Sequence, residues 1–185
     1  MVLFVNACVR KDSRTRQLAE YLLSNLDDEI TEIRLSEINF PLQNEDFLLY
    51  RDHLVEEKCF DDPLLQFACQ FAMADQIVIA APYWDLSFPA VLKQYLEQVS
   101  VVDITFTYTP EGIPKGLCKA KRLYYVTTAG GDYAPDEYGF GYVESLCKSL
   151  YGIQDVKLIK AVGLDIVGAD VENILAESKK EIRMD

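Results

Sequence analysis

The sequence has little of several residue types on which whole classes of protein depend. It contains 9 Gly, 7 Pro, one His and one Trp in 185 residues, and no CxxC pair among its 5 Cys. So little Gly and Pro excludes collagen-like and low-complexity chains, and the Cys spacing gives no support to zinc or thioredoxin-type chemistry. No apolar run approaches the roughly 20 residues of a membrane span, so we expect no membrane insertion.

Positive charge is also scarce. Lys and Arg number 18 against 30 Asp and Glu, which gives a formal net charge of −12. This balance argues against binding of nucleic acid or of an anionic membrane surface, although a few Arg side chains and backbone amides can still form a local anion pocket. Hydrophobic residues make up 50% of the chain, which is typical of one globular domain, and we expect a single domain over residues 1–185.

The cysteines and the first residues predict a location. The Cys are odd in number and irregularly spaced, so we expect free thiols, with Cys69 and Cys147 buried as small apolar residues. Residues Met1–Val5 lack the basic segment of a signal peptide and run directly into a short apolar stretch. Together these features predict a cytoplasmic protein.

Short apolar runs alternate along the chain with longer amphipathic stretches. Continuous apolar runs are typical of parallel strands covered on both faces, and spacings of three and four residues are typical of helices. The expected strands are Val2–Val5, Ile30–Leu35, Gln76–Ala81, Leu123–Thr128 and Val156–Val162. The expected helices are Thr15–Leu26, Leu64–Ala74, Ser87–Val102, Tyr142–Tyr151 and Val171–Ile182, the first of them capped by Asp12 or Ser13.

This alternation of strand and helix predicts an α/β fold. We expect a flavodoxin-like three-layer sandwich with a five-stranded parallel sheet in the order 2-1-3-4-5. In such sheets a ligand binds outside the carboxyl ends of the strands. The segments that should meet there are Cys8–Thr15, Pro82–Ser87 and Thr128–Tyr133.

The first of these segments is basic within an acidic chain. Its neighbourhood holds Arg10, Lys11, Arg14 and Arg16, with Asp12 as the only acid. Ser13 and Thr15 add hydroxyl groups where a helix should begin, which suits a phosphate, whereas a plain helix cap with solvated cations is the simpler alternative. Neither GxGxxG nor a Walker A motif is present, which disfavours a dinucleotide site or a P-loop nucleotidase and favours a monophosphate.

The other two segments offer flat rings and an approachable backbone. Trp84, the only Trp, follows Tyr83, and exposed aromatic faces suit a planar ring system. Asp85 is suited either to cap the next helix or to accept a hydrogen bond from a ring N–H. Gly130 and Gly131 allow backbone amides to approach a ligand closely, or else form a plain turn.

Three stretches in order carry a family resemblance. DQIVIAAPYWDLSFPAVLKQYLEQV, TFTYTPEGIPKGL and KRLYYVTTAGGDY resemble the FMN-dependent NADH-azoreductases of the flavodoxin-like NAD(P)H quinone reductase superfamily, over nearly the whole length. The resemblance implies FMN as cofactor, NADH or NADPH as cosubstrate, and a homodimer with the site at the subunit interface. It implies ping-pong hydride transfer through flavin N5 to a quinone, azo compound or similar small aromatic acceptor, without a catalytic side chain or a metal.

The resemblance also implies roles for individual residues. On the phosphate side these are Cys8, which replaces a family Ser, and Arg10, Ser13, Arg14 and Thr15. Under the isoalloxazine ring they are Pro82, Tyr83, Trp84, Asp85 (where the family has Asn) and Leu86. Along the pyrimidine edge they are Thr128, Ala129, Gly130 and Gly131.

Substrate contacts are implied for two further residues. Tyr133 stands near a position where some members carry His, and it could hydrogen-bond a substrate oxygen. Phe106, with Tyr108, is expected to line the subunit interface, although core packing is the alternative for one of the two. The sole His, His53, is expected on the surface.

A flavodoxin-type one-electron carrier is the alternative function. Carriers are acidic as well, because negative charge steers them to basic partners, and they need no nicotinamide pocket. A protein that keeps the fold without flavin is a third possibility. The TFTYTPEG segment and the lack of a Thr-rich phosphate loop favour the enzyme.

Overall fold

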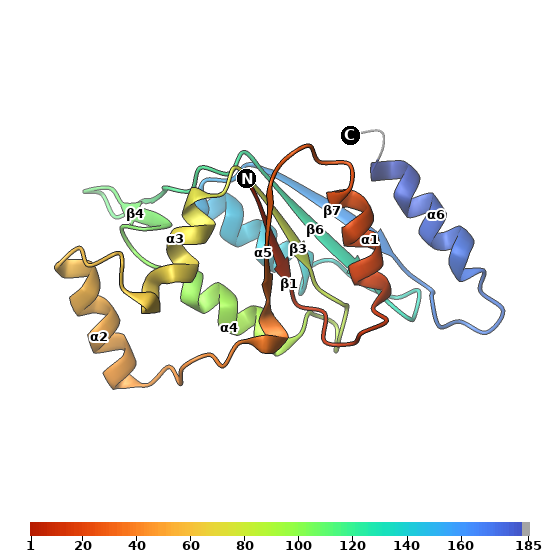
Figure 1. The fold of residues 1–185 in the computed structure, drawn as a ribbon, viewed down its shortest axis with the longest axis horizontal. Helices are drawn as coiled ribbons and strands as arrows, with labels where there is room; N and C mark the ends of the chain where they lie inside the picture. Colours follow the sequence, from red (N-terminus) through yellow and green to blue (C-terminus); the bar gives the residue numbers. More distant parts are fainter. Residues whose placement is uncertain (183–185) are drawn as a thin grey trace.

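The computed structural model describes residues 1–182, and the last three residues of the predicted domain, 183–185, lie outside the described part. At its centre is a parallel sheet (Figure 1). Its strands are β1 (Val2–Asn6), β2 (Ile30–Arg34), β3 (Gln76–Ala80), β6 (Arg122–Thr128) and β7 (Asp155–Ala161). They pair in the order β2-β1-β3-β6-β7, which confirms the predicted flavodoxin-like arrangement.

Helices cover both faces of this sheet, as Figure 1 shows. On one face lie α1 (Arg14–Leu23) and α6 (Val171–Ile182); on the other lie α3 (Gln66–Met73), α4 (Ala90–Val99) and α5 (Phe140–Leu146). Alternate side chains of a strand point to opposite faces. Leu3 and Val5 therefore join the core under α3, α4 and α5, whereas Val2 and Phe4 join the core under α1.

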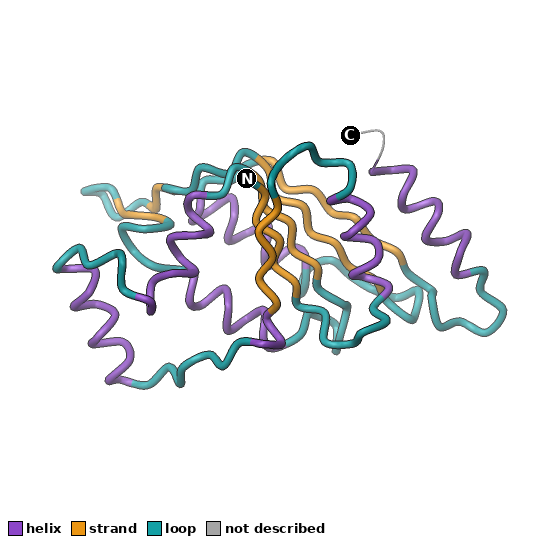
Figure 2. Tube along the Cα trace, viewed as in Figure 1, coloured by secondary structure: helices purple, strands orange, loops and turns teal. Residues whose placement is uncertain are grey.

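Two parts of the chain depart from the predicted elements. Helix α2 (Glu45–Glu56) was not expected, because it buries Leu54 but leaves Leu49 and Tyr50 exposed and so shows little helical periodicity. Figure 2 shows it at one end of the molecule, after a long loop. The hairpin of β4 (Phe106–Tyr108) and β5 (Pro114–Gly116) was also missed, because each strand is only three residues long.

Several boundaries also differ from the sequence pattern. The helix expected over Ser87–Val102 begins only at Ala90, after a tight turn and the capping Pro89. The segment Leu64–Ala74 divides into a short 3-10 turn, η2 (Pro63–Leu65), and α3, and another 3-10 turn, η1 (Leu35–Glu37), follows β2. Helix α5 continues into a π-helical turn, η3 (Cys147–Tyr151), which ends at the left-handed Gly152.

The cysteines and the His can be compared with their expected environments. Cys147 is buried, as predicted, whereas Cys69 is only half-buried. His53 lies on the exposed side of α2, as predicted. All five Cys are free thiols.

The β4–β5 hairpin is attached to the body of the protein by a close backbone contact. A Cβ atom at Gly116 would lie 2.2 Å from both the Gly152 nitrogen and the Tyr151 carbonyl carbon. The Tyr151 side chain is fully buried there, where its hydroxyl lies 2.7 Å from Ser100 Oγ and its ring lies 5.1 Å from that of Phe71. Any side chain at Gly116 must therefore move the backbone.

We expect Gly116→Ala to lower the free energy of unfolding by at least about 2 kcal/mol, because the added methyl group overpacks a backbone contact. Gly131→Ala is the matched control, since nothing lies within 4 Å of a Cβ atom at Gly131 and its φ is not left-handed. Urea denaturation followed by circular dichroism measures both variants. Equal stabilities would contradict the close contact.

Candidate functional site

Loops that follow β1, β3, β6 and β7 meet at the carboxyl edge of the sheet and enclose a cleft of about 340 Å³. This volume lies within the roughly 300–1,000 Å³ range of small-molecule sites. The residues that line the cleft are Arg10, Ser13, Arg14, Thr15, Pro82, Tyr83, Trp84, Thr128, Ala129, Gly130, Leu164 and Asp165. Of the predicted cofactor residues, Cys8, Asp85, Leu86 and Gly131 are absent from this lining.

The loop after β1 is fixed by a buried amide. Asn6 accepts a hydrogen bond from the Cys8 backbone nitrogen at 2.9 Å, and its Nδ2 donates to Glu32 at 2.8 Å. The thiol of Cys8 is itself buried, and burial raises its pKa to about 11. It lies 3.8 Å from the Ala80 carbonyl oxygen, so Cys8 acts as packing beneath the loop and does not line the cleft.

Helix α1 begins at the cleft with Ser13 as its N-cap, which decides between the two predicted caps. The Ser13 hydroxyl accepts a hydrogen bond from the Arg16 amide at 3.3 Å. The amides of Arg14 and Thr15, in the first turn, have no carbonyl within the helix to which they can donate. The cleft therefore has the partial positive charge of a helix N-terminus at one end.

A hydroxyl pair joins α1 to the end of β6. Thr15 Oγ1 lies 2.7 Å from Thr128 Oγ1, and Thr15 is almost fully buried. Each hydroxyl can donate to the other, so one proton of the pair stays available for a further acceptor. The pair holds the helix start and the strand end at a fixed separation on the floor of the cleft.

The three arginines of the basic segment differ in their partners. Arg14 Nη1 donates to Asp165 Oδ1 at 2.6 Å and to the Leu164 carbonyl oxygen at 3.1 Å. Arg16 pairs with Glu20 at 2.7 Å and faces away from the lining. Arg10 lines the cleft and forms no ion pair with any residue from 1 to 182.

The loop after β3 forms a tight turn at the aromatic end of the cleft. Trp84 and Ser87 exchange two backbone hydrogen bonds, of 3.1 and 2.7 Å. Between them Asp85 (φ +50°) and Leu86 (φ +65°) are both left-handed, as a mirror-image two-residue turn requires. Asp and Asn tolerate this conformation better than most residues, which explains how Asp85 can stand where the resembling family has Asn.

Hydroxyl groups attach this turn to the loop after β6. Ser87 Oγ donates to the Tyr138 carbonyl oxygen at 2.6 Å, and the Tyr83 hydroxyl donates to the Pro135 carbonyl oxygen at 3.4 Å. Burial, with Tyr133 and nearby acids, raises the pKa of Tyr83, so its hydroxyl keeps its proton at neutral pH. The Tyr83 side chain and the turn that carries Trp84 are thereby attached to the loop after β6.

The loop after β7 was missed as part of the site. Its Gly163, Leu164 and Asp165 amides donate to the carbonyls of Gly131, Ala129 and Gly130 at 2.9, 3.2 and 2.9 Å. The same strand-end rule that selected the first three loops applies to the segment after β7. Gly163 and Gly168, which are both left-handed in the structure, are the residues in the sequence that could have indicated this loop.

The two predicted substrate residues lie outside the cleft lining. Tyr133 is 75% exposed on the loop after β6. Phe106 is buried in the β4–β5 hairpin, with its ring 5.6 Å from that of Tyr108, so the core-packing alternative holds for Phe106. Tyr108 is the exposed member of the pair.

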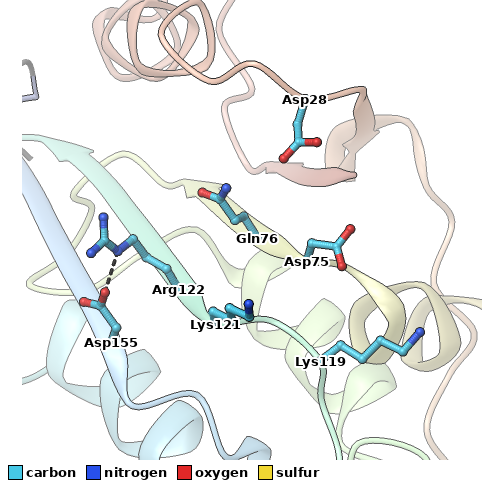
Figure 3. Close-up of a pocket in the computed structure, with 7 residues that line it drawn as sticks. All are labelled: Asp28, Asp75, Gln76, Lys119, Lys121, Arg122 and Asp155. Atoms are coloured by element: carbon cyan, nitrogen blue, oxygen red, sulfur yellow. Dashed lines mark hydrogen bonds and ion pairs between the residues drawn. The ribbon is translucent and has the colours of Figure 1, made fainter.

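A larger cavity, of about 510 Å³, lies at the opposite edge of the sheet, where β3, β6 and β7 begin. Figure 3 shows its charged lining. Three cations (Lys119, Lys121 and Arg122) balance three acids (Asp28, Asp75 and Asp155), and Arg122 is paired with Asp155 at 2.5 Å. With no aromatic wall and no surplus charge, this cavity does not suit a ring or an anion.

The fold and the cleft agree with a known class of protein. A family model described as flavodoxin-like fold matches residues 1–184, and the chain belongs to this family. The family resemblance and fold predicted from the sequence are thus confirmed.

More specific relatives match nearly the whole chain. A protein of Lachnoclostridium phytofermentans named FMN-dependent NADH:quinone oxidoreductase is 36% identical, over 97% of this chain and 94% of its own length. One of Clostridium acetobutylicum with the same name, numbered 2, is 39% identical over 94% and 92%. The chain therefore belongs to the family of these relatives.

A solved structure is also similar to this chain over nearly its whole length. The azoreductase of Bacillus anthracis superposes with a TM-score of 0.84 at 25% identity, over 99% of this chain and 96% of that one. None of these relatives is named as a one-electron carrier.

Among residues 1–182, no helix is both long and apolar enough to cross a membrane. Within the same residues, no cluster of His, Cys, Asp and Glu could hold a metal ion.

The left-handed turn yields a stability prediction. We expect Leu86→Gly to be more stable than Leu86→Ala by about 0.5–1 kcal/mol, because the left-handed conformation costs Ala about 1–2 kcal/mol and chain flexibility offsets only part of this for Gly. Gln94→Gly and Gln94→Ala, at an exposed position in α4, should show the opposite order. Thermal unfolding measures all four variants, and a more stable Leu86→Ala would contradict the turn.

Proposed function

We propose that this protein is an FMN-dependent oxidoreductase that passes reducing equivalents from NADH to quinones, azo compounds or similar aromatic acceptors. The observation that carries the proposal is the cleft, which has an anion-binding end at α1 and an aromatic end at Tyr83 and Trp84. Relatives that match nearly the whole chain are named for FMN, NADH and quinone, which supports the same reading.

The lining residues suit the chemical groups of FMN. Arg10, the Ser13 hydroxyl and the first amides of α1 offer a positive charge and donors for one phosphate. Pro82, Tyr83 and Trp84 offer apolar and aromatic surface for the ring system. Gly130 lies so close to Asp165 that a Cβ atom would meet its carboxylate at 2.3 Å, so only Gly fits at this position of the lining.

When bound, the flavin supplies hydride-transfer chemistry at its N5 atom, between a nicotinamide donor and an aromatic acceptor. The protein residues bind and orient. The Thr15–Thr128 pair fixes the floor of the cleft, and the hydroxyl bonds of Tyr83 and Ser87 fix its aromatic wall. The open side leaves room for donor and acceptor to enter in turn.

We also infer that the protein forms a homodimer and is located in the cytoplasm. Large apolar side chains are exposed on loops beside the cleft at Leu86, Tyr133 and Tyr138, and this supports a homodimer in which a second copy completes the substrate site. Five free Cys support a cytoplasmic location.

For the dimer, we expect sedimentation analysis to give twice the mass of the chain. A monomer at all concentrations would contradict the proposed homodimer.

Reduction by NADH tests the function directly. We expect the protein to be yellow as purified or after addition of FMN, and to lose its flavin absorbance when mixed anaerobically with NADH. A quinone added afterwards should restore the absorbance. Protein that never binds FMN, or flavin that only a one-electron donor can reduce, would contradict the proposal.

Arg10 is expected to attract the phosphate. Arg10→Gln should weaken FMN binding about two- to fivefold, which corresponds to the roughly 0.5–1 kcal/mol of an exposed charge pair, and should leave riboflavin binding unchanged. Lys11→Gln is the matched control, because Lys11 is a neighbouring exposed cation that does not line the cleft. Fluorescence titration measures each affinity, and equal effects of the two variants would refute this placement.

A further inference from the structure

Arg14 and Asp165 form a charge pair inside the cleft lining, although no local sequence pattern indicates a role for the acid. The two residues are 151 positions apart, and their side chains are 38% and 72% exposed. The same Arg14 nitrogen also donates to the Leu164 carbonyl oxygen. The guanidinium is therefore directed at the loop after β7 by two acceptors.

The backbone of this loop places the carboxylate in the cleft. The Asp165 amide donates to the Gly130 carbonyl oxygen at 2.9 Å, and Asp165 Oδ2 lies 2.3 Å from where a Gly130 Cβ atom would be. The carboxylate thus lies against Gly130 and is bonded to Arg14, and all three residues line the cleft. Because Gly has no side chain, nothing displaces Asp165 from this position.

The pair changes the charge that the cleft presents to an anion. Its formal charges are those of Arg10, Arg14 and Asp165, so the sum is +1, whereas the basic segment of the sequence, with four cations and one acid, sums to +3. Arg14 is neutralised by its partner, and Arg10 has none among residues 1–182. A phosphate at the start of α1 therefore meets one unpaired cation and one ion pair whose charges cancel.

We propose that Asp165 is a specificity-determining residue that limits how much the phosphate contributes to flavin recognition. In this role Arg14 is a clamp between α1 and the loop after β7, and Arg10 is the cation that serves the phosphate. The inference rests on the proposed function, because it concerns the phosphate of FMN. Asp165 thereby sets the preference of the cleft for FMN over riboflavin, two molecules that differ only in that phosphate.

The test compares the dissociation constants of FMN and riboflavin by fluorescence titration at low ionic strength. Asp165→Asn keeps the size of the side chain and removes its charge. We expect it to tighten FMN binding about three- to tenfold, with riboflavin unchanged, because it removes a negative charge from the site of a dianion and leaves Arg14 without its acidic partner. Asp132→Asn, an exposed acid outside the lining, is the control for net charge and should change neither constant.

Arg14→Gln separates a clamp from a phosphate ligand. In the wild-type background it should weaken FMN binding, because it leaves the Asp165 carboxylate without its partner beside the phosphate. In the Asp165→Asn background it should undo most of the gain. Weaker FMN binding by Asp165→Asn would show instead that the carboxylate positions Arg14 for the phosphate, and would overturn the inference.

Inorganic phosphate keeps this test independent of the flavin function. Its binding, followed by the shift in melting temperature, should tighten about three- to tenfold in Asp165→Asn and stay unchanged in Asp132→Asn. If no variant bound either flavin, the proposed function would fall, while the phosphate titration would still decide the role of Asp165. An unchanged phosphate affinity in Asp165→Asn would overturn the inference alone.

Discussion

The parallel pairing of β1, β3, β6 and β7 is the constraint on which the cleft depends. Each strand is aligned with its neighbours so that Asn6 lies opposite Ala80, and Thr128 lies opposite Ala161. The loops that follow these strands must therefore leave the sheet at one edge. There the chain has Ser13 at a helix start, two aromatic rings after β3, and glycine after β6, although these segments are far apart in sequence.

Charge at this edge is organised by pairing more than by composition. The chain carries a formal charge of −12, and its basic segment is the main exception. Within that segment Arg14 and Arg16 each have an acidic partner, whereas Arg10, in the cleft lining, has none among residues 1–182. A cluster of cations in the sequence is therefore a poor measure of the charge that a ligand meets, because partners can come from anywhere in the chain.

The central sheet and most of the cleft could be predicted, and the reasons are physical. Buried parallel strands such as Gln76–Ala80 have a continuous apolar sequence, and the strand-end rule then selects the loops. Helix α2 could not be found in this way, because one buried Leu54 gives no periodicity. Asp165 could not be predicted as a site residue, because its role comes from a contact with Arg14, 151 positions away, which no local sequence pattern indicates. Cys8 occupied a predicted ligand position, but only the structure shows its thiol buried under the loop.

The central claim is that one flavin occupies the cleft, with its phosphate at α1 and its ring beside Tyr83 and Trp84. A crystal structure of the protein with FMN tests it most directly. The account predicts the phosphate within hydrogen-bond distance of Ser13 and the first amides of α1, with Arg10 nearby and Arg14 still bonded to Asp165. FMN bound at the opposite edge of the sheet, beside Lys121 and Arg122, or bound in the cleft with its phosphate away from α1, would contradict it.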